Sequence, residues 1–283
     1  MQVVNTVLRA LVDVAQTPFK GLPPLVGIVV WSAITAVGML LVFKRTSNQE
    51  ALAEVKQRIH ASLFEIRLFN DDLGAILRAQ MEILRHNATY LKLSVKPMLW
   101  MIVPLVLLIA QLQYHYGYSP LKPGDEVVVK AAVDDDWVSA NAPAGRPDLE
   151  LEVPDGLSLQ TPGVWSAALG EMAWRLKAEA WGDYQLTLTV DGERVTKRAR
   201  VSQDLVLLSP VRPSTGFVDQ LTWPAEPPLP AESPFCAVEL DYAPADIGLL
   251  GWHWQSEYAW MALYFLLSIV FAFALRKPFG VTI

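Results

Sequence analysis

The stretch QMEILRHNATYLKLSVKPMLWMIVP, residues 80–104, changes character at Lys96-Pro97. Its first half carries the charged and polar side chains of a water-exposed helix, and its second half is apolar. Proline is tolerated in the first turn of a helix but disfavours helix at the residue before it. We therefore expect one helix to end near Lys96 and a membrane-spanning helix to begin at Pro97.

Three stretches of the 283-residue chain are apolar enough to enter a membrane, at 22–43, 98–112 and 258–275. Crossing roughly 30 Å of hydrocarbon takes about 20 helical residues, and the first and third stretches qualify. The second reaches only about 22 Å at 1.5 Å per residue. We predict transmembrane helices at 21–43, 97–116 and 255–276, the second of them short enough to thin the bilayer locally.

Basic residues beside these spans predict their orientation. The first span is followed by Lys44 and Arg45, and the third by Arg276 and Lys277. Basic residues beside a span stay on the cytoplasmic side of the membrane. The N-terminus is then outside and the tail 277–283 is cytoplasmic. Segment 44–97 carries nine Lys and Arg against six Asp and Glu, whereas 114–257 carries ten against 22. This pattern predicts a multi-pass protein of a bacterial inner membrane, and the acidic external part argues against DNA as a partner.

The first 20 residues have the pattern of an amphipathic helix. Asn5, Arg9, Asp13 and Gln16 recur at helical spacing. The other side of the helix is apolar and comprises Val4, Val7, Leu8, Leu11 and Val12. We predict that residues 1–20 lie in the membrane interface, in contact with the lipid bilayer, and the alternatives are a poorly ordered leader and a helix packed on protein.

The spacing of apolar residues in segment 44–96 predicts that it forms an antiparallel coiled-coil hairpin in the cytoplasm. The expected inner face of its first helix comprises Leu52, Val55, Ile59, Leu63 and Ile66. That of its second helix comprises Leu73, Ile76, Leu77, Met81, Leu84 and Leu91. Phe69-Asn70-Asp71-Asp72 between them supplies turn and helix-capping side chains. The alternative is a hairpin that serves only as a solvated spacer.

The alternating runs of segment 117–212 predict that it forms an immunoglobulin-like β-sandwich outside the membrane. Its runs 124–133, 149–153, 174–180 and 183–201 alternate between apolar and polar residues. Asp191-Gly192 between two such runs predicts a type I′ turn. We expect Trp165, Trp174 and Trp181 in the core.

Segment 213–254 begins as a proline-rich stretch, which predicts a covering loop with little regular structure. Aromatic residues then gather before the third span. They are expected to anchor it at the outer membrane interface and comprise Trp252, Trp254, Tyr258 and Trp260.

The sequence shows no motif for catalysis, metal or cofactor. Cys236 is the only cysteine, which excludes a disulfide within the chain and a thiolate cluster. The four histidines are scattered, and no phosphate-binding loop or nucleophile elbow is present. Asp134-Asp135-Asp136 is a candidate calcium site, but EF-hand spacing does not follow, which favours a solvated loop. We predict a protein that is not an enzyme.

Several motifs occur in a recognisable order. The chain has Asp71-Asp72 in the hairpin turn, Gln80-Met81-Glu82-Ile83-Leu84 on the second helix, and Lys96-Pro97-Met98 with Pro104 at the next span. These motifs resemble the YidC/Oxa/Alb insertase superfamily, in particular its compact branch of archaeal YidC-like proteins and the third subunit of the ER membrane protein complex. The resemblance covers about residues 1–113 and 255–283. Two departures are the lack of Arg or Lys within the spans and the large external insertion at 114–250.

The resemblance implies a membrane-protein insertase or insertion chaperone that acts without nucleotide. Polar residues in the spans are candidates to line a weakly polar groove, and the alternative is ordinary helix packing. They are Ser32, Thr35, Gln111, Gln113 and Ser268.

A basic row on the hairpin is the candidate contact for nascent membrane proteins, a ribosome or anionic lipid, unless it is simply a solvated face. It comprises Arg78, Arg85, Lys92 and Lys96. The competing hypothesis is a scaffolding subunit of an envelope complex that docks a periplasmic protein through the sandwich and a second partner through the hairpin. A receptor or sensor is a third, weaker hypothesis.

Overall fold

The computed structural model describes residues 2–69, 71–143, 145–249 and 251–281. The chain divides into two compact units. The sheet unit comprises Met1–Ile28 and Leu107–Ala262, and the helix unit comprises Val29–Val106 and Leu263–Ile283. Helices α2 (Pro24–Thr46), α4 (Leu73–Tyr116) and α7 (Ala259–Leu275) each contribute residues to both units.

Two helices are long and apolar enough to cross a membrane. They are α2, with 23 residues, and α4, with 44 residues. Helix α7 is also apolar but has only 17 residues. The third span therefore remains a prediction.

Helix α4 runs without a break through Pro97 and Pro104, so the predicted helix boundary at Lys96-Pro97 is wrong. A proline inside a helix removes one backbone N–H donor and tends to kink the helix. The helix can still continue past the proline if the neighbouring residues keep their backbone hydrogen bonds. Apolar residues follow Pro97 and flank Pro104 on both sides, and an unpaired backbone group is costly in apolar surroundings, which favours continued helix. The charged and apolar halves of the opening stretch thus belong to one continuous helix.

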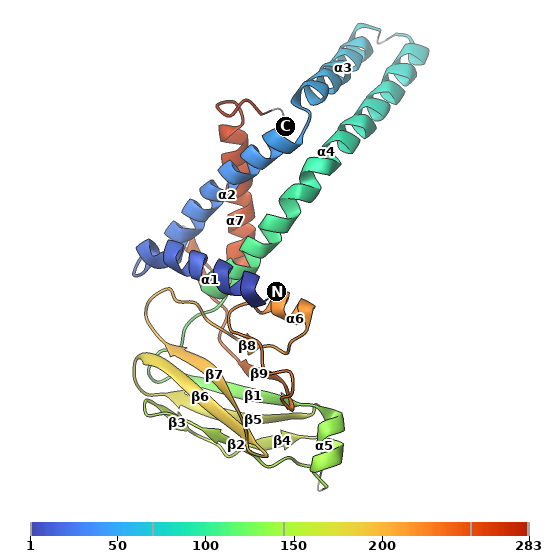
Figure 1. Cartoon of the computed structure of the whole chain (residues 1–283). Helices are drawn as coiled ribbons and strands as arrows, with labels where there is room; N and C mark the ends of the chain where they lie inside the picture. The colour runs from blue at the N-terminus through green and yellow to red at the C-terminus, as the bar shows by residue number, and fades with distance from the viewer. Residues whose placement is uncertain (1, 70, 144, 250, 282–283) are drawn as a thin grey trace. The chain divides into compact units, whose positions relative to one another are not determined.

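Helix α3 (Gln49–Leu68) lies beside the first half of α4 within the helix unit (Figure 1). Asn48 caps α3 by accepting a hydrogen bond from the Ala51 amide at 3.1 Å. Asp72 Oδ1 accepts from the Gly74 amide at 2.8 Å and so caps α4. Asp72 thus plays the predicted capping role, whereas Asn70 of the predicted turn lies outside the described residues.

Only one of the two predicted apolar stripes in this hairpin faces inward. On α3, Leu52 and Val55 are buried, although Leu63 is 47% exposed. In the hairpin half of α4, Ala75 and Ala79 are buried, and their small side chains allow another helix to approach closely. Most of the stripe predicted to be internal is exposed instead, namely Leu73, Leu77, Met81, Leu84 and Leu91. The prediction failed because periodicity defines an apolar face but not the element that covers it.

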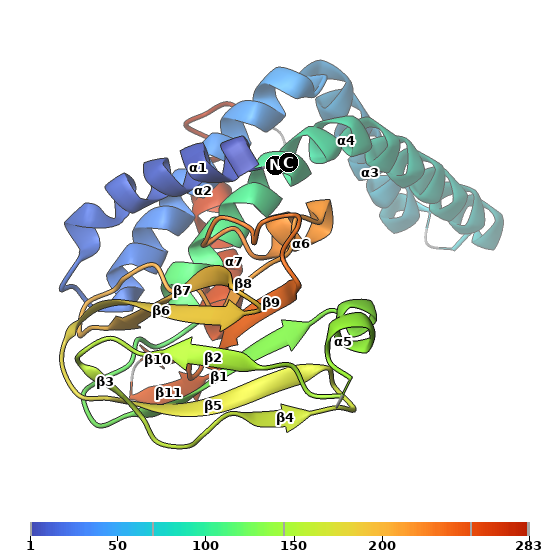
Figure 2. The ribbon, with the colours of Figure 1, turned by 60° about the horizontal axis from the view of Figure 1, so that its bottom comes forward.

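The sheet unit contains two antiparallel sheets that share one core, and Figures 1 and 2 show them face to face. The larger sheet has the order β3-β5-β1-β9-β8, with β4 also paired to β5, and the smaller has the order β2-β6-β7. The strands are β1 (Glu126–Val133), β2 (Leu149–Glu152), β3 (Leu157–Leu159), β4 (Val164–Ser166), β5 (Glu171–Ala178), β6 (Gly182–Val190), β7 (Glu193–Val201), β8 (Val211–Arg212) and β9 (Phe235–Leu240). Alternate residues of both sheets fill the core. The immunoglobulin-like assignment remains a prediction.

The predicted turn in the smaller sheet is confirmed. Val190 pairs with Glu193, and the two residues between them, Asp191 and Gly192, have φ of 48° and 81°. Positive φ at both central positions is the mark of a type I′ turn.

The tryptophan predictions have mixed outcomes. Trp174 is buried in the core, and Trp165 is partly buried against it. Trp181 is 47% exposed, so its predicted core position is wrong. It lies between β5 and β6, where the alternation of the strands is interrupted and no longer points the side chain inward.

The proline-rich segment is more regular than predicted, and the sandwich does not end at residue 212. Strand β9 comes from this segment and pairs with β1 in the centre of the larger sheet. Phe235, Val238 and Leu240 of β9 are buried, a short alternating pattern that the surrounding prolines obscured. The segment also forms α6 (Phe217–Thr222) and the hairpin of β10 (Asp246–Leu249) with β11 (Trp252–Gln255).

The N-terminal residues of the sheet unit form α1 (Gln2–Gln16), followed by a short 3-10 helix η1 (Thr17–Phe19). A further short helix, α5 (Asp135–Asn141), follows β1. Asp134 caps α5 by accepting from the Trp137 amide at 2.9 Å. Asp134 therefore has a structural role that the solvated-loop prediction did not include.

Candidate functional site

Three of the predicted groove residues meet in the helix unit at a contact between α2 and α7. Ser32 Oγ donates to the Tyr264 carbonyl at 3.1 Å, and the Tyr264 hydroxyl donates to Thr35 Oγ1 at 2.8 Å. Ser268 Oγ donates to the Ser32 carbonyl at 3.4 Å. Ser32 and Thr35 are buried. These hydroxyls are engaged in helix packing, and Tyr264, which joins two of them, is a residue that the sequence analysis missed.

Gln111 differs from these residues because its amide is not fully satisfied. The side chain lies on α4, in the sheet unit, and is 2% exposed. Its Oε1 atom has no hydrogen-bond partner among the described residues. Leaving a buried acceptor unpaired costs about 1–3 kcal/mol. Gln111 is therefore a candidate position for a polar group that comes from outside the chain.

Gln113, two residues further on, has a structural role in the sheet unit. Its Oε1 accepts from Trp260 Nε1 at 2.8 Å, and its Nε2 donates to the Glu257 carbonyl at 3.3 Å. The amide thus ties the end of α4 to the start of α7. Both ends of the amide are occupied, which leaves no free polar atom for a groove.

The same contact corrects one of the predicted interfacial anchors. Trp260 is fully buried and packs on Tyr116, with the ring centroids 6.0 Å apart. Trp252 on β11 is 83% exposed, and Trp254 and Tyr258 are also exposed. Trp260 is held inside because Gln113 satisfies its indole N–H, a long-range partner that sequence spacing does not reveal.

Helix α1 packs on the rest of the sheet unit through its polar face. Asn5 Nδ2 donates to the Gln220 carbonyl at 2.5 Å, and Arg9 donates to the Ala225 carbonyl at 3.0 Å. Most of the apolar residues point outward, with exposed side chains at Val3, Val4, Val7, Leu11 and Val14, whereas Val12 of the predicted apolar face is buried. The helix is therefore packed on protein, and contact of its exposed apolar side chains with lipid stays a prediction.

The end of the same polar face brings together residues far apart in the sequence. His115 of α4 is buried, and its Nε2 lies 3.1 Å from Asp13 Oδ1 while its Nδ1 lies 3.2 Å from the Gln111 carbonyl. The Tyr116 hydroxyl donates to Gln16 Oε1 at 3.0 Å. The sequence does not reveal a partner for His115, because the carboxylate of Asp13 lies about a hundred positions earlier in the chain. These bonds fasten α1 to the end of α4.

The predicted basic row lies on α4, within the helix unit. All four side chains are exposed, and three of them, Arg78, Arg85 and Lys92, recur every seven residues. Residues seven apart lie nearly above one another on a helix. The structure therefore brings these three cations onto one face, and Lys96 continues the row.

A buried ion pair clamps the proline-rich segment to β7 in the sheet unit. Lys197 is fully buried, and its Nζ donates to Glu226 Oε2 at 2.5 Å, to the Ser209 carbonyl at 2.5 Å and to Ser209 Oγ at 2.9 Å. Glu226 Oε1 accepts from the Arg198 amide at 2.8 Å. Burial raises the pKa of Glu226, but the Lys197 ammonium, the Ser209 hydroxyl and the Arg198 amide together hold this pKa below its usual value.

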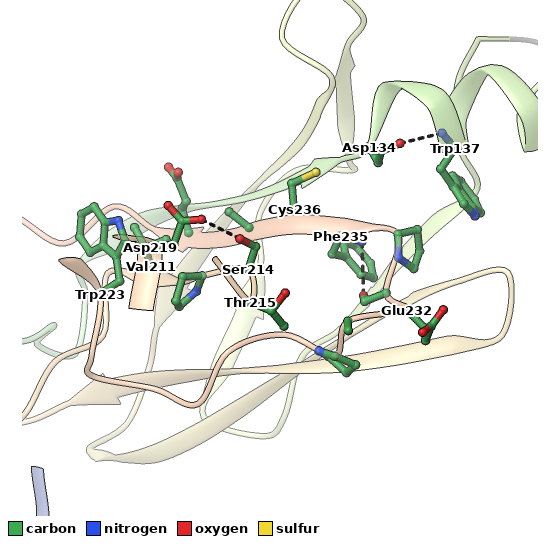
Figure 3. Close-up of a pocket in the computed structure, with 17 residues that line it drawn as sticks. Asp134, Trp137, Val211, Ser214, Thr215, Asp219, Trp223, Glu232, Phe235 and Cys236 are labelled. Carbon is green, nitrogen blue, oxygen red and sulfur yellow. Dashed lines mark hydrogen bonds between the residues drawn. The ribbon is translucent and has the colours of Figure 1, made fainter. Parts of the chain in front are cut away.

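The sheet unit has a pocket of about 650 Å³ beside β9 (Figure 3). Its wall combines the aromatic side chains Trp137 and Trp223 with the carboxylates Asp134 and Asp219. The Cys236 thiol also lines it, and burial together with the neighbouring Asp134 raises the pKa of this thiol. A thiol with a raised pKa is a weak nucleophile.

Comparisons with known proteins give no relative for this chain. No protein-family model, no curated protein and no solved structure matches it.

Proposed function

We propose that the protein is a membrane-protein insertase or insertion chaperone of the YidC-like type. It would reside in a bacterial inner membrane with its N-terminus outside and would lower the barrier for nascent segments. The proposal rests on the motif order of the sequence and on one structural observation, the buried and unpaired amide oxygen of Gln111.

The unpaired oxygen supports this function because of what an entering segment needs. A polar group that moves into hydrocarbon without a partner costs several kcal/mol. Gln111 offers an acceptor within an apolar helix, and its own unsatisfied state is relieved when a donor arrives. Polar side chains follow at Gln113 and His115, so the apolar part of α4 stays short although the helix itself continues. A short apolar stretch favours local thinning of the bilayer.

A scaffolding subunit of an envelope complex is the second candidate. Ser32, Thr35 and Ser268 are engaged between α2 and α7, which is the arrangement of ordinary helix packing. The pocket beside β9 offers a periplasmic partner a surface of aromatic, proline and acidic residues. These two observations favour docking over insertion.

Insertion by the purified protein in proteoliposomes tests the first candidate. The probe is a reporter with one Leu/Ala segment and a short polar tail, and the readout is protease protection of that tail. Gln111→Met keeps the side-chain length and removes the amide, and Ile109→Met is the matched control on the same helix. The loss of one hydrogen bond of about 1 kcal/mol predicts about a fivefold slower insertion for Gln111→Met alone.

The thermal midpoint separates this loss from a loss of folding. Gln111→Met removes a buried unpaired acceptor, so the thermal midpoint should stay unchanged or rise. Equal insertion by wild type and Gln111→Met would contradict the role given to this residue.

A further inference from the structure

An apolar stripe on α4 is exposed in the helix unit. Leu77, Leu84 and Leu91 recur every seven residues, and Met81 lies between the first two. Each of these side chains is between 57% and 66% exposed. An apolar stripe that repeats every 3.5 residues is the contact surface of a coiled coil, so a second helix would complete it.

The hairpin does not supply that second helix. Ala75 and Ala79, which are buried in the hairpin half of α4, lie roughly 160° around the helix from the centre of the stripe at 100° per residue. Glu82 of α4 accepts a hydrogen bond from Ser62 of α3 at 3.5 Å and lies close to the alanine side of the helix. The stripe therefore faces away from α3 and is free to meet a partner.

Charge selects among possible partners. Arg78, Arg85 and Lys92 each directly follow a leucine of the stripe, so they form a basic row along one edge. The other edge carries uncharged polar side chains at Gln80, Asn87 and Ser94. In a coiled coil these edge positions meet the edge positions of the partner helix.

A second copy of the chain would leave the basic row without a counter-charge. An antiparallel pair of α4 helices would set basic row against basic row, because like edges meet in that orientation. A parallel pair would set the basic row against the uncharged edge. Neither arrangement offers a carboxylate to Arg78, Arg85 or Lys92.

We propose that the stripe binds an amphipathic helix of another protein that has apolar residues at heptad spacing and acidic residues along the edge facing Arg78, Arg85 and Lys92. The leucines provide apolar burial, and the basic row fixes orientation and selects acidic partners. The surface between Leu77 and Leu91 is only about 21 Å long, which fits a reversible contact. The inference holds for an insertase and for a scaffold alike.

Two synthetic 21-residue peptides test the proposal against the full chain in lipid nanodiscs. Both carry Leu at the core positions of three heptads, and their edge positions carry Glu in one peptide and Lys in the other. Binding is measured by fluorescence anisotropy, with empty nanodiscs as the background. The acidic peptide should bind about tenfold more tightly than the basic one, since three edge charges change from repulsion to attraction.

Variants of the full chain connect this preference to the stripe. Leu84→Glu should weaken acidic-peptide binding by about tenfold, because it puts a charge into the apolar contact. Thr89→Glu, on an exposed position outside the stripe, is the matched control and should bind nearly as wild type does. Changing all three basic residues to Glu should reverse the preference in favour of the basic peptide. All these positions are exposed, so folding should be retained.

Three results would overturn the proposal. The first is equal binding of both peptides, and the second is binding that Leu84→Glu does not weaken. The third is a disulfide between two copies of a Leu84→Cys variant in a Cys236→Ser background, with doubled particle mass, because the stripe would then be occupied by a second copy.

Discussion

Replacing Glu226 by Gln should destabilise the sheet unit severely, because it leaves the Lys197 ammonium buried without a counter-charge. Lys197 is fully buried, and Glu226 Oε2 is its carboxylate partner at 2.5 Å. Removing one member of a buried ion pair costs about 3–5 kcal/mol. The free energy of unfolding of the sheet unit should therefore fall by about that amount. Denaturant unfolding of the full chain in detergent, followed by tryptophan fluorescence, measures the change because Trp174 lies in the core.

A matched control exists in the same sheet. Asp183 pairs with Arg200 at 2.7 Å, but its side chain is 60% exposed. Solvent screening limits such a pair to about 0–1 kcal/mol, so Asp183→Asn should have little effect. A loss of stability for Glu226→Gln no larger than that for Asp183→Asn would contradict the stabilising role given to the buried pair.

The pH dependence gives an independent check on the same pair. The pKa of Glu226 is lowered from its ordinary value of 4.5 in the folded protein. The unfolded chain therefore binds this proton first as the pH falls, and the stabilisation is fully present above about pH 4.5. It is lost as the pH falls further through the folded-state pKa. Glu226→Gln should lack this part of the acid sensitivity.

Three smaller predictions concern packing and turns, each read as the thermal midpoint in detergent. Tyr264→Phe removes the donor to Thr35 and should cost about 0.6–1.7 kcal/mol, and an unchanged midpoint would show that this bond does not stabilise the contact between α2 and α7. Gly27→Ala would put a Cβ atom 2.0 Å from the Tyr116 hydroxyl, so it should cost about 1–3 kcal/mol, and a neutral result would mean that the ring moves freely. Gly192→Ala forces φ of 81° on a residue with a Cβ and should cost about 1–2 kcal/mol, whereas no loss would argue against the type I′ turn.

Local features of the fold were predictable from the sequence because they depend on neighbouring residues. The type I′ turn follows from Asp191-Gly192 and the flanking alternation. The long apolar helices α2 and α4 follow from composition. The continuity of α4 through Pro97 was not predictable in this way, because a proline that kinks a helix and one that starts a helix look alike in sequence.

Features that depend on long-range contacts were missed. The stripe from Leu77 to Leu91 has the periodicity of a coiled-coil core, and the sequence does not say that Ala75 and Ala79 form the buried side instead. The pairing of His115 with Asp13 joins residues about a hundred positions apart. Among the groove candidates, the sequence could not separate hydroxyls engaged in packing from the unpaired amide of Gln111, because the difference depends on which atoms face them.

Photocrosslinking in living cells tests the insertase proposal most directly. A compact diazirine side chain replaces Leu107, one turn before Gln111 on the same face of α4, and Leu266, which is 60% exposed on α7, carries the control probe. If the protein is an insertase, we expect adducts to many short-lived nascent membrane proteins from position 107 and few from position 266. Adducts from position 107 to only one or two stable proteins would contradict insertion and identify a subunit of a complex.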